Sequence, residues 1–157
     1  MSIYKGSQLI SGSIPNSANQ SLSNLDNTGQ AVIDGQWQFI NAVIMDDVSV
    51  TGSSNLSYTL SDIPDDGHMY EVILTGTAQT GTASGNFCPL QLRSDFSTGA
   101  VTRICSARTR SSSFLQAQGT VIIPLTTSRN IYVSRDTGWV GTVKLWLIGY
   151  RRIGTNS

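Results

Sequence analysis

The chain has 157 residues, of which 39% are hydrophobic and only 13% are charged, and its formal net charge is zero. A charged fraction so far below the average of roughly 25% argues against a coiled coil or a long solvated helix. No apolar run approaches the ~20 residues that a membrane-spanning helix needs, so membrane insertion is not expected. The length predicts one domain, and a single histidine, His68, argues against a histidine-centred metal site.

Residues 1–36 are predicted to form an extended N-terminal arm. Ser, Asn and Gln dominate this stretch, and its apolar residues are too sparse for it to fold independently. We expect the arm to be ordered by neighbouring subunits, by a larger assembly, or not at all. The residues expected to carry this attachment are Ile3, Tyr4, Leu9, Ile10, Leu22 and Leu25.

Residues 37–157 are predicted to form an all-β domain. Short runs rich in Val, Ile, Thr, Tyr, Phe and Trp are separated by Gly, Asp, Asn and Ser. Eight strands at roughly ten-residue spacing favour an antiparallel β-sandwich of the jelly-roll kind. The predicted strands are Gln38–Met45, Asn55–Leu60, Met69–Thr77, Phe87–Arg93, Val101–Ala107, Leu115–Leu125, Asn130–Arg135 and Gly141–Arg152.

Charge is divided unevenly along the chain. Residues 1–85 carry a net charge of −7, and residues 86–157 carry +7. Halves of opposite charge attract each other, within one chain or between neighbours. Arg103, Arg108 and Arg110 are therefore expected to pair across subunits with the acidic half, the alternative being an acidic polysaccharide. A nucleic-acid partner is not expected, because the arginines are dispersed and lack a recognised binding motif.

Cys88 and Cys105 flank a predicted hairpin whose centre lies near residues 96 and 97. A symmetric hairpin would place the two cysteines opposite each other, which leaves a disulfide open. Two sulfurs without a histidine make a poor zinc site. Free, largely buried thiols are the favoured interpretation.

The last predicted strand is apolar on both of its faces. A strand in a two-layer sandwich is expected to have one wet face, so part of its second face is predicted to meet another subunit. The alternative is a central strand that is covered within its own protomer. The residues predicted for the oligomer interface are Val143, Leu145, Trp146, Leu147, Ile148 and Tyr150.

The segment around the turn Asp136-Thr137-Gly138 is the predicted ligand-binding site. Its candidate residues are Tyr132, Arg135, Asp136 and Trp139. Aromatic faces stack on the C–H groups of sugars, and exposed aromatic side chains on loops are typical of binding sites. The alternative is that Trp139 packs into the sandwich or into a subunit interface.

The sequence predicts neither an enzymatic activity nor a metal-binding site. The acidic residues Asp62, Asp65, Asp66 and Glu71 raise a calcium site as an alternative, but their spacing does not match an EF-hand loop and Asp-Asp-Gly is ordinary turn chemistry. No serine lies in a Gly-x-Ser-x-Gly motif, and one glutamate makes a glycosidase carboxylate pair improbable. We therefore expect no enzyme, no catalytic residue, no metal and no cofactor.

Three segments of the chain resemble the small fibre and fibre-tip proteins of bacteriophages. The first is Ser21-Leu22-Ser23-Asn24-Leu25-Asp26-Asn27-Thr28-Gly29-Gln30-Ala31. The second runs from Pro64 to Val72 and continues in Thr80-Gly81-Thr82-Ala83-Ser84-Gly85-Asn86. The third is the ending Gly149-Tyr150-Arg151-Arg152-Ile153-Gly154-Thr155-Asn156.

The resemblance implies a virion structural protein, assembled in the host cytoplasm, that forms a short head or tail fibre or a fibre tip. Such proteins form homotrimers through a β-sandwich tip, and the resemblance implies that the arm contacts other virion proteins. Such tips commonly bind a saccharide or protein of the host surface, so host adhesion is expected. The alternatives are a soluble lectin-like module and a capsid decoration protein without receptor binding.

Overall fold

The structure is a computed structural model that describes residues 35–93, 100–110 and 115–155. All regular secondary structure in these ranges is β, as predicted. The strands are β2 (Gln38–Ser49), β3 (Leu56–Thr59), β4 (His68–Thr80), β5 (Phe87–Arg93), β6 (Val101–Arg108), β7 (Gln116–Leu125), β8 (Asn130–Val133) and β9 (Gly141–Thr155).

The eight predicted strands are all present, and the differences lie at their ends. β2 continues beyond Met45 because its C-terminal part stays paired with β9, where Ser49 lies opposite Thr142. β8 is shorter than predicted and ends at Val133. The backbone N–H of Arg135 donates instead to the Asn55 side chain, at 3.3 Å.

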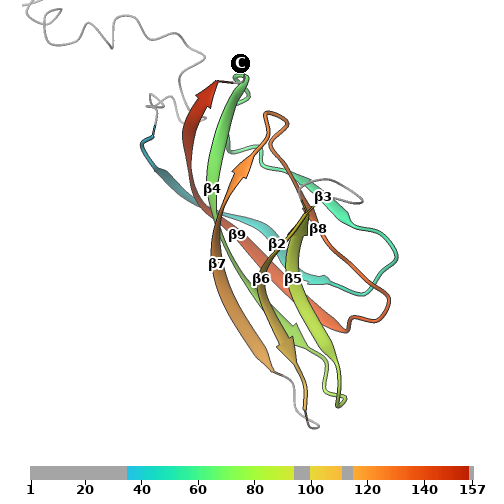
Figure 1. Cartoon of the computed structure of the whole chain (residues 1–157). Coiled ribbons are helices and arrows are strands. Elements are labelled where there is room, and N and C mark those ends of the chain that lie inside the picture. The colour runs from blue at the N-terminus through green and yellow to red at the C-terminus, as the bar shows by residue number, and fades with distance from the viewer. Residues whose placement is uncertain (1–34, 94–99, 111–114, 156–157) are drawn as a thin grey trace, which may run out of the picture.

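The strands form two four-stranded antiparallel sheets, ordered β2-β9-β4-β7 and β3-β8-β5-β6 (Figure 1). The first half of the chain pairs with the second half in reverse order, so that β2 meets β9, β3 meets β8, β4 meets β7 and β5 meets β6. Two further pairings, β4 with β9 and β5 with β8, join these ribbons into the sheets.

One hydrophobic core is shared by both sheets. Because successive side chains of a strand point to opposite faces, every second residue of β4 and β9 faces inward. Val72, Leu74, Leu145 and Leu147 are fully buried in this way, and Leu90 of β5 meets them from the other sheet. Burial of each such side chain stabilises the fold by roughly 1.5–3 kcal/mol.

Ion pairs connect the acidic first half of the chain to the basic second half within one protomer. The pairs are Asp46 and Asp47 with Lys144, Asp65 with Arg129, Asp66 with Arg152, and Glu71 with Arg151. Part of the predicted attraction between the halves is therefore satisfied inside the chain. Arg103 and Arg108 do not take part, and neither contacts a carboxylate of the described residues.

The register of the β5–β6 hairpin differs from the symmetric one predicted for the cysteines. Cys88 lies opposite Ala107, and Cys105 lies opposite Leu90, with a register shift between Leu90 and Gln91. The prediction that the cysteines face each other is therefore wrong. Both thiols are free and buried, as favoured from the sequence.

The two thiols lie in the apolar space between the sheets. Burial raises the pKa of the Cys88 thiol to about 11 and also raises that of Cys105. The Sγ of Cys88 lies 3.5 Å from the carbonyl oxygen of Thr142. These cysteines are therefore core residues, since a reactive cysteine needs an exposed site with a lowered pKa.

Candidate interaction surfaces

The outward side of the β2-β9-β4-β7 sheet carries an apolar row that crosses all four strands. Phe39 of β2 lies opposite Gly149 of β9, which lies opposite Ile73 of β4, which in turn lies opposite Ile122 of β7. Phe39 is 70% exposed and Ile122 is 57% exposed. The Phe39 ring lies against Gly149, where a Cβ atom would stand 3.1 Å from it, so glycine leaves room for the ring.

A second row lies two to four residues away along the same strands. Val43 of β2 lies opposite Trp146 of β9, and Thr75 of β4 lies between Trp146 and Thr120 of β7. Val43 is 64% exposed. We define the apolar face by its five apolar side chains, Phe39, Val43, Ile73, Ile122 and Trp146.

Ion pairs border the apolar face on both sides. Beyond Trp146, Lys144 of β9 contacts the carboxylates of Asp46 and Asp47. Beyond Gly149, the Arg151 Nη2 atom lies 2.6 Å from the Glu71 carboxylate. A large apolar patch with a polar border is typical of a protein–protein contact. The Arg151–Glu71 pair is balanced, whereas Lys144 faces two carboxylates and leaves one excess negative charge at its border.

The predicted oligomer interface is corrected for four of its six residues. The four lie in the core of the protomer with at most 1% of their surface exposed: Val143, Leu145, Leu147 and Tyr150. They face the second sheet, which was the alternative left open by the sequence. Trp146 lies on the apolar face, and Ile148, at the irregularity between Leu147 and Gly149, is partly exposed.

Two of the predicted ligand-binding residues hold the backbone near their own turn. The Arg135 Nη2 atom donates to the carbonyl oxygen of Thr51, at 2.5 Å. The Asp136 carboxylate accepts a hydrogen bond of 2.7 Å from the N–H of Gly138. Both side chains therefore have structural partners inside the protomer, and a ligand would have to compete with these contacts.

The two predicted aromatic residues lie apart, Tyr132 on a strand and Trp139 in the loop between β8 and β9. Tyr132 is on β8 and is partly exposed. Trp139 is also partly buried, packs against the core and meets the Phe87 ring edge-on with 6.3 Å between ring centroids. This packing of Trp139 was the alternative considered from the sequence.

Sequence reasoning named Arg103 and Arg108 as candidates for an acidic polysaccharide, but missed the cluster that they form around Phe87 on the outward side of the β3-β8-β5-β6 sheet. The pairing of β5 with β6 places Arg108 opposite Phe87 and Arg103 opposite Gln91. The guanidinium carbons of Arg103 and Arg108 lie 5.7 and 5.8 Å from the Phe87 ring centroid. We call Phe87, Arg103, Arg108 and Trp139 the arginine–aromatic cluster. The alternation of Phe87 and Gln91 on one predicted strand was the available signal.

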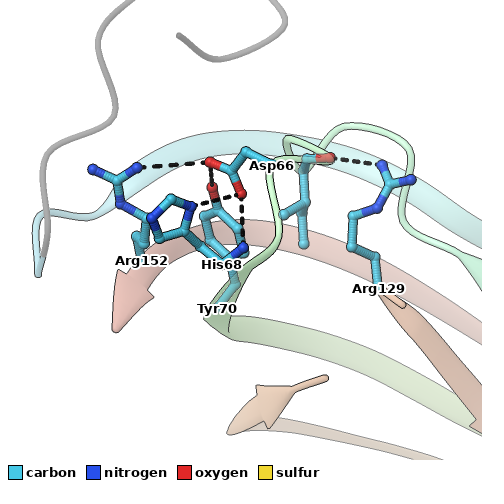
Figure 2. A network of polar contacts seen from close by, with 6 residues as sticks. Asp66, His68, Tyr70, Arg129 and Arg152 are labelled. Carbon is cyan, nitrogen blue, oxygen red and sulfur yellow. Dashed lines mark hydrogen bonds and ion pairs between the residues drawn. The ribbon is translucent and has the colours of Figure 1, made fainter. Parts of the chain in front are cut away.

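A buried carboxylate organises the turn before β4 (Figure 2). The Asp66 side chain, which is 3% exposed, accepts hydrogen bonds from the His68 N–H at 3.1 Å and the Tyr70 hydroxyl at 2.8 Å. The Arg152 Nη1 atom lies 3.6 Å from the same carboxylate. Burial, and then the bond to Asp66, raise the pKa of Tyr70. These contacts attach the turn to β4 and β9.

The four acidic residues considered for calcium do not converge on one point. Asp65 contacts Arg129 at 2.8 Å, whereas Asp66 lies beside Arg152, and Figure 2 shows Arg129 and Arg152 on opposite sides of the Asp66 carboxylate. Glu71 contacts Arg151 on the outward side of β4. Within residues 35–93, 100–110 and 115–155, no group of three or more His, Cys, Asp or Glu side chains is placed to hold a metal ion. The geometry therefore gives the calcium alternative no support.

A cavity of about 350 Å³ opens between the two sheets near β7. Its lining is mainly apolar and includes Leu92, Ile123 and Ile131, with Arg93 and Asn130 among the polar residues. None of the predicted ligand-binding residues lines it. The cavity is therefore distinct from the arginine–aromatic cluster.

The residues predicted for the attachment arm, Ile3, Tyr4, Leu9, Ile10, Leu22 and Leu25, lie outside the described residues. The described chain begins at Gly35, whose N–H donates to the carbonyl oxygen of Arg152 at 2.8 Å. The described ranges contain no helix with the length and apolarity to cross a bilayer. In comparisons with known proteins, no protein-family model and no curated protein sequence matches this chain.

Proposed function

We propose that the chain is a structural subunit of a bacteriophage virion, a short fibre or fibre tip that trimerises and contributes to adhesion at the host surface. The observation that carries the proposal is the apolar face, which crosses four strands and leaves Phe39, Val43 and Ile122 more than half exposed. Such a face is costly for an isolated domain in water. The resemblance of three segments to phage fibre proteins supports the virion assignment.

The finer fold that we propose for the domain is the jelly roll. The reversed pairing of β2–β5 with β6–β9 is that of a long antiparallel ribbon with its tip between β5 and β6. Rolling such a ribbon brings β4 beside β9 and β5 beside β8, which are the two further pairings present. Closed two-sheet architectures of this kind protect most strand edges, and they leave two outward faces for contacts.

The occupant that we propose for the apolar face is the same face of further copies of the chain. The bordering ion pairs, Lys144 with Asp46 and Asp47 and Arg151 with Glu71, keep each margin close to neutral. The Lys144 margin carries one excess negative charge and the Arg151 margin none, so identical copies can meet there with little repulsion between like charges. Burial of exposed Phe, Val and Ile side chains contributes roughly 1.5–3 kcal/mol each, repeated in every copy.

The arm is proposed to connect the trimer to other virion proteins. Gly35, where the described chain begins, is bonded to the C-terminal part of β9 next to the Asp66 turn. An arm that leaves the domain there starts at the end of the sandwich rather than on either outward face. Both faces therefore stay available, one for the other copies and one for a ligand.

The test is the mass of the full chain in solution, measured by size-exclusion chromatography with light scattering. We expect about three times the 16.8 kDa of one chain. Val43→Lys, which places a charge on the apolar face, is expected to give single chains that remain folded. Ser57→Lys, on the exposed side of β3, is the matched control and is expected to stay trimeric.

A single-chain mass for the unchanged protein would contradict the trimer. A chain that is monomeric when complete, and that associates only after residues 1–34 are removed, would show instead that its own arm occupies the apolar face. A trimer that dissociates on Val43→Lys but not on Ser57→Lys supports the proposal.

A second candidate, a lectin-like module without a virion, rests on the arginine–aromatic cluster alone. A lectin-like module would also bind saccharide, but it would not need other copies of the chain to cover the apolar face. A folded monomer that binds saccharide would favour it over the fibre.

A further inference from the structure

The two arginines of the arginine–aromatic cluster are held in place by uncharged neighbours. Gln91 Oε1 accepts hydrogen bonds from both Nε and Nη2 of Arg103, at 3.3 and 3.2 Å. Gln91 is 6% exposed, so it is a fixed acceptor. This contact uses one edge of the Arg103 guanidinium and leaves the Nη1–Nη2 edge without a partner among the described residues.

The cluster brings two positive charges close together on a sheet whose strands carry no acidic residue. Arg103 and Arg108 lie at similar distances, 5.7 and 5.8 Å, from the same Phe87 ring and are both exposed. The strands β3, β5, β6 and β8 contain no Asp or Glu residue. Two guanidinium groups near one ring repel each other, and a bound anion would relieve that repulsion.

We infer that the arginine–aromatic cluster is a binding site for a carboxylate-bearing polysaccharide. A guanidinium edge matches the two oxygens of a carboxylate, and Arg103 is already oriented by Gln91, so little side-chain freedom is lost on binding. Phe87 and Trp139 supply partly exposed aromatic surface beside the arginines, to which the C–H groups of a sugar ring can pack. The site therefore combines recognition of charge with recognition of a sugar ring.

A polysaccharide fits the surroundings of the cluster better than a nucleic acid does. The formal net charge of the chain is zero, and residues 1–85 carry −7, which repels a long and densely charged strand. The outward positions beside the cluster are neutral, for example Ser106 of β6 opposite Pro89 of β5. A polysaccharide carries isolated carboxylates among many hydroxyl groups, and this pattern matches two arginines that are surrounded by neutral residues.

This inference rests on the proposed function in one respect, since three copies would present three such sites together. Several weak sites on one particle bind a repeating polymer much more tightly than one site does. The ligand class, by contrast, follows from the cluster itself and does not depend on the trimer.

Binding of the full chain is measured by biolayer interferometry on four immobilised acidic polymers, polygalacturonate, alginate, hyaluronate and polysialic acid, in about 150 mM salt. Dextran is the neutral control and polydeoxythymidine the nucleic-acid control. We expect binding to at least one acidic polysaccharide and to neither control. The double variant Arg103→Gln/Arg108→Gln is expected to bind at least about tenfold more weakly.

Arg110→Gln is the control for charge, because it removes one positive charge, where the double variant removes two, from an exposed arginine beyond the end of β6. It is expected to change binding by less than about twofold if position, and not net charge, decides affinity. Light scattering on the same samples reports whether the oligomer is intact. An intact trimer that binds none of the four polymers overturns the inference but leaves the proposed function standing.

Three further results would also overturn the inference. They are equal losses from the double variant and from Arg110→Gln, binding to polydeoxythymidine as tight as to any polysaccharide, and a change of oligomeric mass in the double variant. The last result would make the cluster a contact between subunits. A monomer that still binds an acidic polymer through Arg103 and Arg108 would instead contradict the fibre proposal and support the site.

Discussion

The two sheets share one core, but their outward sides differ in kind. The outward side of β2-β9-β4-β7 is apolar at its centre, with Phe39 70% exposed and ion pairs at its borders. The outward side of β3-β8-β5-β6 carries Arg103 and Arg108 around Phe87 and has no acidic residue on its strands. Alternation of side chains is the same in both sheets. The residues at the outward positions therefore decide which partner each side suits.

Two neighbouring residues of β9 offer the largest test of this difference. Leu145 is fully buried between the sheets, whereas Trp146 points to the apolar face. Leu145→Ala is expected to lower the free energy of unfolding by about 2–5 kcal/mol, because it leaves a cavity in the core. Trp146→Ser is expected to leave the folded protomer intact but to weaken association. Urea denaturation and light scattering measure the two effects.

This difference between Leu145 and Trp146 would be contradicted if both residues proved to be core residues. If Trp146→Ser unfolded the protomer as strongly as Leu145→Ala and left the oligomeric mass unchanged, the outward side of β9 would be a second core surface. The apolar face would then have no role in association.

The next largest effect is the loss of stability on removing one of two carboxylates near the start of β4. Asp66→Ala is expected to destabilise the protomer by about 3 kcal/mol, because it leaves the Arg152 guanidinium and the Tyr70 hydroxyl without their buried acceptor. Glu71→Ala removes a more exposed pair with Arg151 and is expected to cost less than about 1 kcal/mol. Thermal unfolding of both variants checks the order, and equal losses would contradict it.

A third effect, which depends on pH, concerns the inward side of β5, directly beneath the arginine–aromatic cluster. The folded-state pKa of Cys88 is raised to about 11, so the folded protein keeps its proton when the unfolded chain has lost it. Cys88 therefore contributes stability below about pH 8.5, and this contribution is lost as the pH rises toward the folded-state pKa. The loss is on the order of 2 kcal/mol.

Urea denaturation between about pH 8 and 11 measures this loss, and Cys88→Ala separates it from the titration of other groups. The difference in stability between the two proteins is expected to shrink as the pH rises. A constant difference would mean that the Cys88 side chain reaches water in the folded state.

The positions of the strands were predictable because they depend on local chemistry. The turn residues around Gly67 and Gly138 separate β-branched and aromatic runs, and all eight predicted strands are present. The ends of the strands depend on partners that are distant in sequence. β8 ends early because Arg135 bonds to Asn55, 80 residues away, and no local pattern near Arg135 indicates this.

The faces of the strands were harder to predict than the strands themselves. The alternation on β9 separates Leu145 from Trp146, but both are apolar, so the pattern alone does not say which of them faces the core. The cysteine register was missed because the hairpin is not symmetric about residues 96 and 97: Arg93 pairs with Val101 beside the loop, and the irregularity between Leu90 and Gln91 shifts the pairing by one further residue. The same pairing brings Arg103 and Arg108 to Phe87, a contact that the sequence pattern did not indicate.

The central claim is that other copies of the chain cover the apolar face, and thiol labelling tests it most directly. Val43→Cys places a thiol where the protomer is 64% exposed, and Ser57→Cys places one on the exposed side of β3. At high protein concentration we expect maleimide to label Val43→Cys at least about tenfold more slowly than Ser57→Cys, and dilution below the association range to remove this protection. Equal labelling rates at every concentration would contradict the claim.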